Sequence, residues 1–243
     1  MNVFEQLEYD GVIPVVSPAV GADVHMLADA FLAGGLSCVE VVLDDERAFD
    51  AVRTLAQRGD LVVGAGWVLS VEMARAAVTA GASYLACPGL NIKLVQFCQQ
   101  QGIPVLPGIS NPTELHMAHD LGLEIVKFFP AEVSGGTAML DVMARPYRNM
   151  RFIPEGGIEP ANLMSYLEHD QVIACSADWV AEPRLYMDEQ YARVTTLVRE
   201  AVRLTAKWET CPDSRGPLLI RYRVSQPNGA ALVQNGLNHA LTT

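Results

Sequence analysis

The chain has 243 residues, and its 28 acidic and 17 basic side chains give a net charge of −11. Half of its residues are hydrophobic and 19% are charged, a composition that excludes intrinsic disorder. The acidic balance argues against a nucleic-acid partner, because such proteins carry a basic stripe. The lysines are scarce, and they stand at Lys93, Lys127 and Lys207.

No apolar run approaches the roughly 18 residues that a membrane-spanning helix needs, so we expect no membrane partner. The mixed, acidic N-terminus does not resemble a signal peptide. The cysteines form no C-x-x-C pair, and we expect free thiols. These features predict a cytoplasmic protein.

Short apolar runs alternate eight times with helical patterns. The expected strands are Val12–Val16, Cys38–Leu43, Leu61–Ala65, Tyr84–Cys87, Pro104–Leu106, Ile125–Phe129, Phe152–Pro154 and Val172–Cys175. The expected helices are Asp23–Ala33, Glu46–Arg58, Val71–Ala80, Asn91–Gln101, Pro112–Leu121, Thr137–Ala144, Pro160–His169 and Glu189–Trp208. Eight strand–helix units predict a (β/α)8 TIM barrel over residues 1–208, with a doubly wound parallel sheet as the alternative.

Both ends of the chain stand outside this repeat. Asn2–Tyr9 is predicted to be a short helix that closes one end of the barrel. Residues 209–243 form a C-terminal extension in which an alternating run, Leu218–Val224, precedes a turn signal at Pro227-Asn228-Gly229. A hairpin, an oligomer contact, a lid and a loosely ordered extension all fit this pattern.

Lys127 stands inside the apolar strand Ile125–Phe129. Lysine is almost never fully buried unless it is paired or functional. An apolar site lowers the pKa of a lysine and makes its amine a nucleophile toward a carbonyl carbon. A lysine that reaches out at the strand end, or a buried ion pair, is the structural alternative.

Glu40 is a second ionisable group inside an apolar strand, Cys38–Leu43. Burial raises the pKa of a carboxyl group, which suits general acid–base chemistry. A lysine that forms a Schiff base and a glutamate that moves protons make a class I aldolase pair. A structural Lys–Glu ion pair remains the alternative.

The segment Lys127–Glu132, followed by Gly135-Gly136, resembles the Schiff-base segment of the 2-keto-3-deoxy-6-phosphogluconate / 4-hydroxy-2-oxoglutarate (KDPG/KHG) aldolases. The similarity runs from about residue 1 to residue 205. Further matching segments are Ala33–Gly35, Val39–Val41, Gly64–Gly66, Cys87–Leu90, Pro107–Ser110 and Gly156–Ile158.

The resemblance implies a (β/α)8 barrel, usually a homotrimer, with neither metal nor organic cofactor. It implies that Lys127 forms the carbinolamine and imine of a carbonyl substrate, and that Glu40 moves protons through water. Retro-aldol cleavage would then release pyruvate and an aldehyde, which makes the chain a carbon–carbon lyase. The expected substrate-binding residues are Asp44, Trp67, Pro88, Phe129, Glu155, Gly156, Gly157, Ser176 and Asp178.

Several of these positions depart from the family pattern. Asp44 and Trp67 stand where members usually have an arginine and a threonine that hold the keto-acid end of the substrate. Glu155 and Asp178 replace a threonine and a serine around the phosphate, and Ser176-Ala177 replaces a Gly-Gly pair. Because carboxylates repel a phosphate, we expect an unphosphorylated substrate, polyhydroxylated or cationic.

Two other functions share this scaffold. Alternating side chains would place Asp44 in the lumen with Glu40, and such a carboxylate cluster could bind Mg²⁺ in a metal-dependent lyase or isomerase. A non-catalytic binding protein that has kept the barrel is the second alternative. Otherwise we expect no metal: His116 and His119 are three residues apart on one helix but lack a third ligand of matching spacing.

Overall fold

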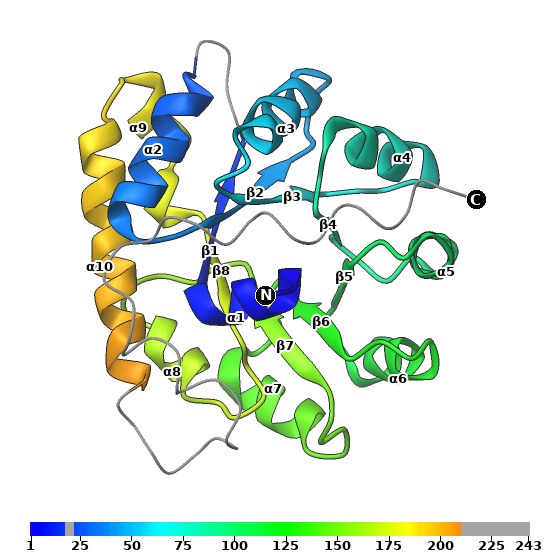
Figure 1. Ribbon diagram of the computed structural model, residues 1–243. Coiled ribbons are helices and arrows are strands. Elements are labelled where there is room, and N and C mark those ends of the chain that lie inside the picture. Colours follow the sequence, from blue (N-terminus) through cyan, green and yellow to red (C-terminus); the bar gives the residue numbers. More distant parts are fainter. Residues whose placement is uncertain (18–21, 210–243) are drawn as a thin grey trace.

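The computed structural model of the chain describes residues 1–17 and 22–209 and forms a (β/α)8 barrel (Figure 1). The strands are β1 (Val12–Val16), β2 (Cys38–Val42), β3 (Val62–Gly66), β4 (Tyr84–Cys87), β5 (Val105–Ile109), β6 (Ile125–Phe128), β7 (Arg151–Pro154) and β8 (Cys175–Ala177). The helices are α1 (Val3–Asp10), α2 (Val24–Gly34), α3 (Arg47–Arg58), α4 (Val71–Ala80), α5 (Ile92–Gln101), α6 (Pro112–Asp120), α7 (Gly136–Ala144), α8 (Leu163–Leu167), the 3-10 turn η1 (Trp179–Ala181), α9 (Pro183–Met187) and α10 (Tyr191–Glu209).

All strand pairs are parallel, and they follow the order β7-β6-β5-β4-β3-β2-β1-β8. At the seam of the sheet, β7 contacts the segment that leads into β8 through a bridge between Phe152 and Val172, together with a 3.1 Å hydrogen bond from the Ile173 amide to the Phe152 carbonyl. The sheet is therefore nearly closed, and the predicted TIM barrel is confirmed over the doubly wound alternative.

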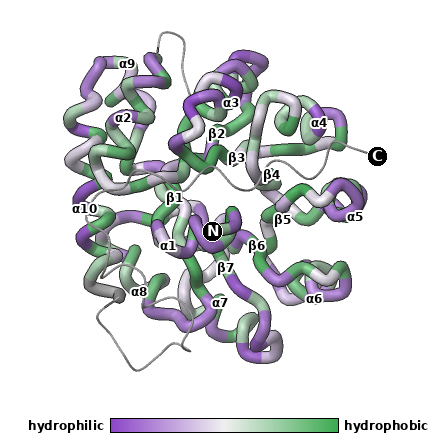
Figure 2. The backbone as a smooth tube through the Cα atoms, in the orientation of Figure 1, coloured by the Kyte–Doolittle hydropathy of each residue, from purple (hydrophilic) through white to green (hydrophobic). Residues whose placement is uncertain are grey.

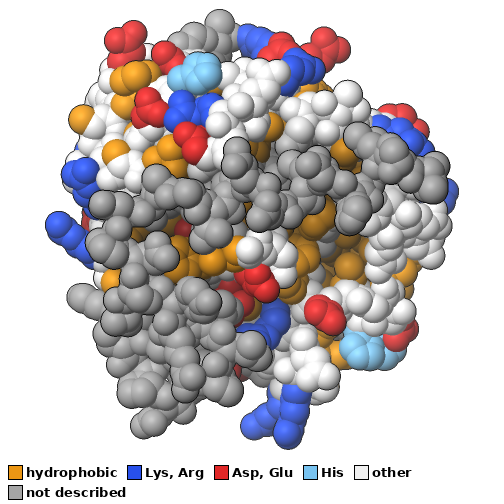
Figure 3. Space-filling model, in the orientation of Figure 1, with side chains coloured by type: hydrophobic (Ala, Val, Ile, Leu, Met, Phe, Trp, Pro, Cys, Tyr) orange, Lys and Arg blue, Asp and Glu red, His pale blue; other side chains and the backbone are white. Residues whose placement is uncertain are grey.

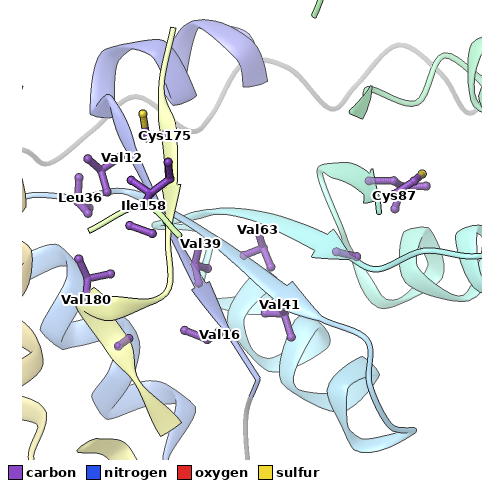
Figure 4. Close-up of a cluster of buried hydrophobic side chains, with 14 of the residues drawn as sticks. Val12, Val16, Leu36, Val39, Val41, Val63, Cys87, Ile158, Cys175 and Val180 are labelled. Carbon is purple, nitrogen blue, oxygen red and sulfur yellow. The ribbon is translucent and has the colours of Figure 1, made fainter. Parts of the chain in front are cut away.

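Alternate side chains of each strand separate into two apolar layers. One cluster lies between strands and helices, and it includes Val12, Val39, Val41, Val63 and Cys175 (Figure 4). The lumen cluster fills the barrel and consists of Leu7, Ile13, Cys38, Tyr84, Ala86, Leu106, Ile153, Ile173 and Ala174. Figure 2 shows apolar residues along the strands and hydrophilic stretches on the surrounding helices.

The N-terminal helix closes one end of the barrel, as predicted. α1 begins with a capping box between Asn2 and Glu5 and places the buried Leu7 in the lumen cluster. Asp10, at the end of α1, is fully buried and accepts a 3.0 Å hydrogen bond from the backbone amide of Ser37. This bond ties α1 to the segment that leads into β2.

The structure differs from the predicted bounds of one strand and one helix. Val172–Cys175 was expected as the eighth strand, but β8 is Cys175–Ala177, because Val172 makes only an isolated bridge. Pro160–His169 contains only the short helix α8, since Glu159 and Asn162 organise its first residues into a turn. The C-terminal extension lies outside the described residues except for Glu209, which ends α10.

Charged side chains gather mainly around the rim of the face seen in Figure 3, while hydrophobic side chains are visible near its centre. None of the helices in residues 1–17 and 22–209 is long and apolar enough to cross a membrane. The described cysteines, Cys38, Cys87, Cys98 and Cys175, are all buried and unpaired, as the sequence predicts for thiols.

Candidate active site

Lys127 lies on β6 and points into the barrel. Its neighbours Val126 and Phe128 belong to the layer between strands and helices, so the alternation of the strand turns Lys127 toward the lumen. Only 2% of the lysine is exposed. A buried ammonium needs compensating charges, and two carboxylates supply them.

Glu40 on β2 is the first partner of Lys127. Its Oε1 accepts a hydrogen bond from Lys127 Nζ at 2.6 Å, and its Oε2 accepts one from the hydroxyl of Tyr84 on β4 at 3.2 Å. The glutamate is 1% exposed. Lys127 and Tyr84 thus each bind one oxygen of the Glu40 carboxylate. Lys127 and Glu40, which the sequence suggested as a pair, are in contact.

Glu155 is the second partner of Lys127, at the carboxyl end of β7. Its Oε2 accepts a hydrogen bond from Lys127 Nζ, and its side chain keeps 13% exposure. The backbone around it is held to the turn after β6, where the amide of Ala131 donates to the Glu155 carbonyl at 2.7 Å. The carboxylate predicted beside a phosphate therefore lies beside the nucleophile candidate instead.

An apolar site was expected to lower the pKa of Lys127, but the two carboxylates beside it have the opposite effect. Burial acts to lower the pKa of Lys127, but the charges and hydrogen bonds of Glu155 and Glu40 raise this pKa above its ordinary value. Burial raises the pKa of Glu40, with a further contribution from Glu155, and Lys127 and Tyr84 oppose that change. Lys127 at rest is an ammonium.

A small pocket gives access to this triad from the carboxyl ends of the strands. It is lined by Glu40, Trp67, Ala86, Cys87, Pro88, Lys127, Phe129 and Glu155. Its free volume is about 10 Å³, roughly the space of one water molecule. Trp67 is 46% exposed and adopts a left-handed backbone conformation with a φ of 57°. Four predicted substrate-binding residues, Trp67, Pro88, Phe129 and Glu155, thus converge on Lys127.

Asp44 and Asp178 do not line this pocket. β2 ends at Val42, so the alternation that was expected to turn Asp44 into the lumen stops before it, and its side chain is exposed. Asp178 is also exposed, and it directly precedes η1. The cluster of carboxylates expected in the mouth is reduced to Glu40 and Glu155, whose shared ion-pair partner is Lys127.

Gly156 and Gly157 follow β7 and Ser176 lies in β8, and the three do not line the pocket. The two glycines have φ values of 94° and 79°, which non-glycine residues rarely adopt. Ser176 faces the lumen between Cys175 and Ala177, whose side chains belong to the outer layer. It is 2% exposed, and its hydroxyl is buried without a hydrogen-bond partner. A ligand or water that reaches this hydroxyl would satisfy it.

Three residues that were not expected to be part of the site shape the triad. Tyr84 lies two residues before Ala86 in the same strand, so both side chains face the lumen. This spacing in an apolar strand could have predicted that Tyr84 is buried. Gly64 and Gly66 make room, because a Cβ at Gly64 would overlap the Tyr84 ring and one at Gly66 would lie 2.7 Å from Glu40 Oε1. Gly64 stood in an expected strand and Gly64–Gly66 in a segment that resembles the family, but the pattern does not show which side chains these glycines make room for.

The described residues contain no group of three or more His, Cys, Asp or Glu side chains placed to hold a metal ion. His116, for example, has its Nδ1 2.9 Å from the Tyr147 hydroxyl. The carboxylates that could have formed a magnesium site contact Lys127 instead. The donor set in this pocket fits a lysine-based reaction better than a divalent cation.

A buried lysine flanked by carboxylates at the open end of a (β/α)8 barrel is the arrangement of a class I aldolase, a lyase that works through a Schiff base. The profile of the KDPG and KHG aldolase family matches residues 3–197. The chain belongs to this family, and it is a carbon–carbon lyase.

Known relatives agree with this assignment. The chain is 40% identical to the 2-dehydro-3-deoxy-phosphogluconate aldolase of Treponema pallidum over 84% of its own length and 98% of that protein. It is 38% identical to the KHG/KDPG aldolase of Escherichia coli over 79% and 90% of the two chains.

Solved structures show the same fold. The 2-keto-3-deoxy-6-phosphogluconate aldolase of Zymomonas mobilis aligns with a TM-score of 0.79 at 34% identity, covering 84% of this chain and 98% of that chain. The KDPG aldolase of Legionella pneumophila aligns with a TM-score of 0.77 at 29% identity, covering 81% and 97%. That structure holds pyruvate captured as a covalent carbinolamine.

Proposed function

We propose that Lys127 is the Schiff-base nucleophile and Glu40 the acid–base residue of an aldolase that cleaves or forms a C–C bond in a 2-keto-3-deoxy or 4-hydroxy-2-oxo acid. The observation that carries this proposal is the contact between Lys127 Nζ and Glu40 Oε1 at 2.6 Å in the barrel lumen, beside the pocket. The pyruvate carbinolamine in the Legionella relative supports the same chemistry.

The reaction begins with loss of a proton from the Lys127 ammonium. The free amine then adds to the C2 carbonyl carbon, and the carbonyl oxygen takes a proton to give the carbinolamine. Water leaves as the imine forms. A base removes the proton of the C4 hydroxyl, the C3–C4 bond breaks, and its electrons pass into the imine to form an enamine. The aldehyde departs, the enamine takes a proton at C3, and water releases the 2-oxo acid.

Glu40 suits the proton transfers in this sequence. Its raised pKa brings proton donation closer to neutral pH, and Tyr84 holds its second oxygen so that Oε1 faces Lys127. Because its carboxylate lies at hydrogen-bond distance from Nζ, it can serve each intermediate formed on that nitrogen directly or through one water.

The substrate is proposed to be unphosphorylated. Two carboxylates face one ammonium at the triad, so its summed charge is −1. No Arg or Lys other than Lys127 lines the pocket within the described part of the chain. A phosphate group that entered this pocket would therefore meet a net negative charge, which disfavours an anionic substrate group there.

Borohydride trapping tests the Schiff base. Wild type incubated with pyruvate or 2-keto-3-deoxygluconate and then reduced should gain the mass of the reduced imine on the peptide that carries Lys127. Lys127→Ala should lose the adduct, whereas Lys93→Ala, which removes a lysine of helix α5, should retain it. No adduct with any 2-oxo acid would contradict the proposal.

Turnover tests the substrate class. The kcat/KM for 2-keto-3-deoxygluconate should exceed that for its 6-phosphate by at least tenfold. The reverse order would contradict the charge argument while leaving the Schiff-base chemistry intact.

We propose in addition that the enzyme acts as a homotrimer in the cytoplasm. The family resemblance supports the trimer, and the buried free thiols Cys38, Cys87, Cys98 and Cys175 fit a reducing compartment. Light scattering on the purified full chain tests the trimer, and fractionation of the producing cells tests the compartment.

A further inference from the structure

We infer that Glu155 determines substrate specificity by exchanging partners: it holds the Lys127 ammonium in the free enzyme and accepts a hydrogen bond from a substrate hydroxyl or amine when Lys127 reacts. This inference rests on the proposed function, since it assigns to that same site the chemical group that a substrate must carry. A 2-oxo acid without such a donor, pyruvate for example, would leave the carboxylate without a partner.

The first support is the position of Glu155 relative to Glu40. Both carboxylates contact Lys127 Nζ, but Glu40 is also bonded to Tyr84 and closely packed against Gly66. The described residues give Glu155 no side-chain partner other than Lys127. Glu155 is therefore the carboxylate that can leave the lysine at the lower cost.

The second support is the mobility that the local packing allows. The main chain is fixed, because the amides of Ala131 and Glu132 donate to the carbonyls of Glu155 and Gly156 at 2.7 and 3.1 Å. The side chain of Glu155 keeps 13% exposure toward the pocket, so rotation about its own bonds suffices to release Lys127. The exchange requires no loop movement.

The third support is the space in the pocket. The free volume of about 10 Å³ gives room for roughly one water molecule while Glu155 contacts Lys127. Because the Glu155 carboxylate lines this pocket and contacts Nζ, its movement away from Nζ opens space beside the amine for a carbonyl carbon. Because a carboxylate that leaves an ammonium needs another donor, substrates that supply one are favoured over those that do not.

The exchange also controls the protonation of the amine. The titratable groups around Lys127 in the described residues are Glu40 and Cys38 from β2, Glu155 after β7, and Tyr84 and Cys87 from β4. Glu155 and Glu40 both favour the ammonium form of Lys127, so departure of Glu155 removes one of two negative charges that hold the proton. Substrate binding thereby makes the amine easier to deprotonate.

Two variants of Glu155 and one control variant test whether its charge and its contact with Lys127 matter. Glu155→Gln removes the charge, and Glu155→Asp keeps the charge but shortens its reach to Lys127. Glu159→Gln is the matched control, because Glu159 is exposed on the same loop and its backbone amide, not its carboxylate, is bonded to Asn162. Far-ultraviolet circular dichroism and thermal melting establish that each variant is folded.

The first readout does not depend on turnover. Competitive labelling of Lys127 with acetic anhydride between pH 6 and 11 reports the fraction of free amine. We expect the labelling profile of Glu155→Gln to shift to lower pH by at least about one unit, the profile of Glu155→Asp to shift by less, and that of Glu159→Gln to match wild type.

The second readout is the rate of borohydride-trapped adduct at pH 7 with pyruvate and with 2-keto-3-deoxygluconate. Wild type should react faster with the hydroxylated acid. Glu155→Gln should react with pyruvate at least about tenfold faster than wild type does, and its preference for the hydroxylated acid should disappear.

The outcomes distinguish the two proposals. A folded Glu155→Gln with unchanged labelling and unchanged pyruvate trapping would overturn the role of Glu155, even if Lys127 forms imines. A shifted labelling profile with no adduct from either acid would support the hold of Glu155 on Lys127 and overturn the Schiff-base function.

Discussion

The hydroxyl of Tyr84 donates a hydrogen bond to Glu40 Oε2 across 3.2 Å, at the side of the carboxylate that faces away from Lys127. Both groups are completely buried. The tyrosine ring stands over Gly64, where no Cβ could be accommodated. The carboxylate proposed to move protons is therefore positioned by a neighbour that does not touch the lysine.

Tyr84→Phe is expected to lower kcat about tenfold with little change in KM. The tyrosine hydrogen bond lowers the pKa of Glu40, so its loss should raise that pKa further and shift the acid limb of the kcat profile to higher pH. Stability should fall by only about 1 kcal/mol. Tyr166→Phe removes a tyrosine hydroxyl that bonds Glu132 instead, and an identical pH shift in that control would contradict the assignment.

Gly66→Ala should abolish activity while the fold persists. The new Cβ would lie 2.7 Å from Glu40 Oε1 and 3.2 Å from its Cγ, so the carboxylate must move away from Lys127. We expect a decrease in kcat/KM of at least about 100-fold, together with a loss of unfolding free energy of about 1–3 kcal/mol. Gly89→Ala adds a methyl group into open space and should retain both properties.

Ser176→Ala should stabilise the protein and impair its reaction. The buried hydroxyl lacks a partner, and such a group costs about 1–3 kcal/mol, so its removal should raise the free energy of unfolding by about 1 kcal/mol. If Ser176 meets the substrate, kcat/KM should decrease several-fold at the same time. Unchanged kinetics in the stabilised variant would remove Ser176 from the substrate contacts.

Asp10→Ala should destabilise the barrel by about 2–4 kcal/mol, measured by urea denaturation. The variant loses hydrogen bonds from the Ser37 amide at 3.0 Å and from Gln6 Nε2 at 3.1 Å, and it leaves these half-buried donors unsatisfied. Because Asp10 lies at the end of the barrel opposite the pocket, imine trapping by the remaining folded protein should be unchanged. Asp29→Ala, an exposed site on α2, is the control.

Stability should fall steeply in alkaline solution under reducing conditions. Burial raises the pKa of Cys87 to about 12 and raises the pKa of Cys175 further still, whereas the unfolded thiols ionise near pH 8.5. The folded state then holds protons that the unfolded state has lost, so each such thiol removes about 1.4 kcal/mol of stability per pH unit above that point. Urea midpoints from pH 7 to 10.5 measure the slope, which Cys175→Ala should reduce.

The sequence predicted the barrel because each strand except the eighth carries enough apolar residues to be recognised. β8 has only three residues, and its Ser176 faces the lumen, so the more apolar Val172–Cys175 was chosen instead. The pairing of Lys127 with Glu40 followed from two ionisable residues in apolar strands. The prediction that Asp44 points into the lumen was wrong for a different reason. Side chains alternate between the two faces only while the chain remains in the strand, and β2 ends at Val42.

Glu155 shows the limit of inference from the family pattern. Its position in sequence indicated a phosphate site, but a glutamate side chain is longer than the threonine it replaces and reaches back to Lys127. Charge attraction between residues 28 positions apart decides where it points, and no local pattern contains that information.

The closure of the barrel by α1 has a consequence for the movement of protons and water. Leu7 and the rest of the lumen cluster fill the amino-terminal end of the barrel, so the described residues leave Glu40 accessible from the carboxyl-terminal end, where the pocket lies. The pocket between Trp67 and Glu155 thus offers a shared route for the substrate, for the water released on imine formation and for protons exchanged with solvent.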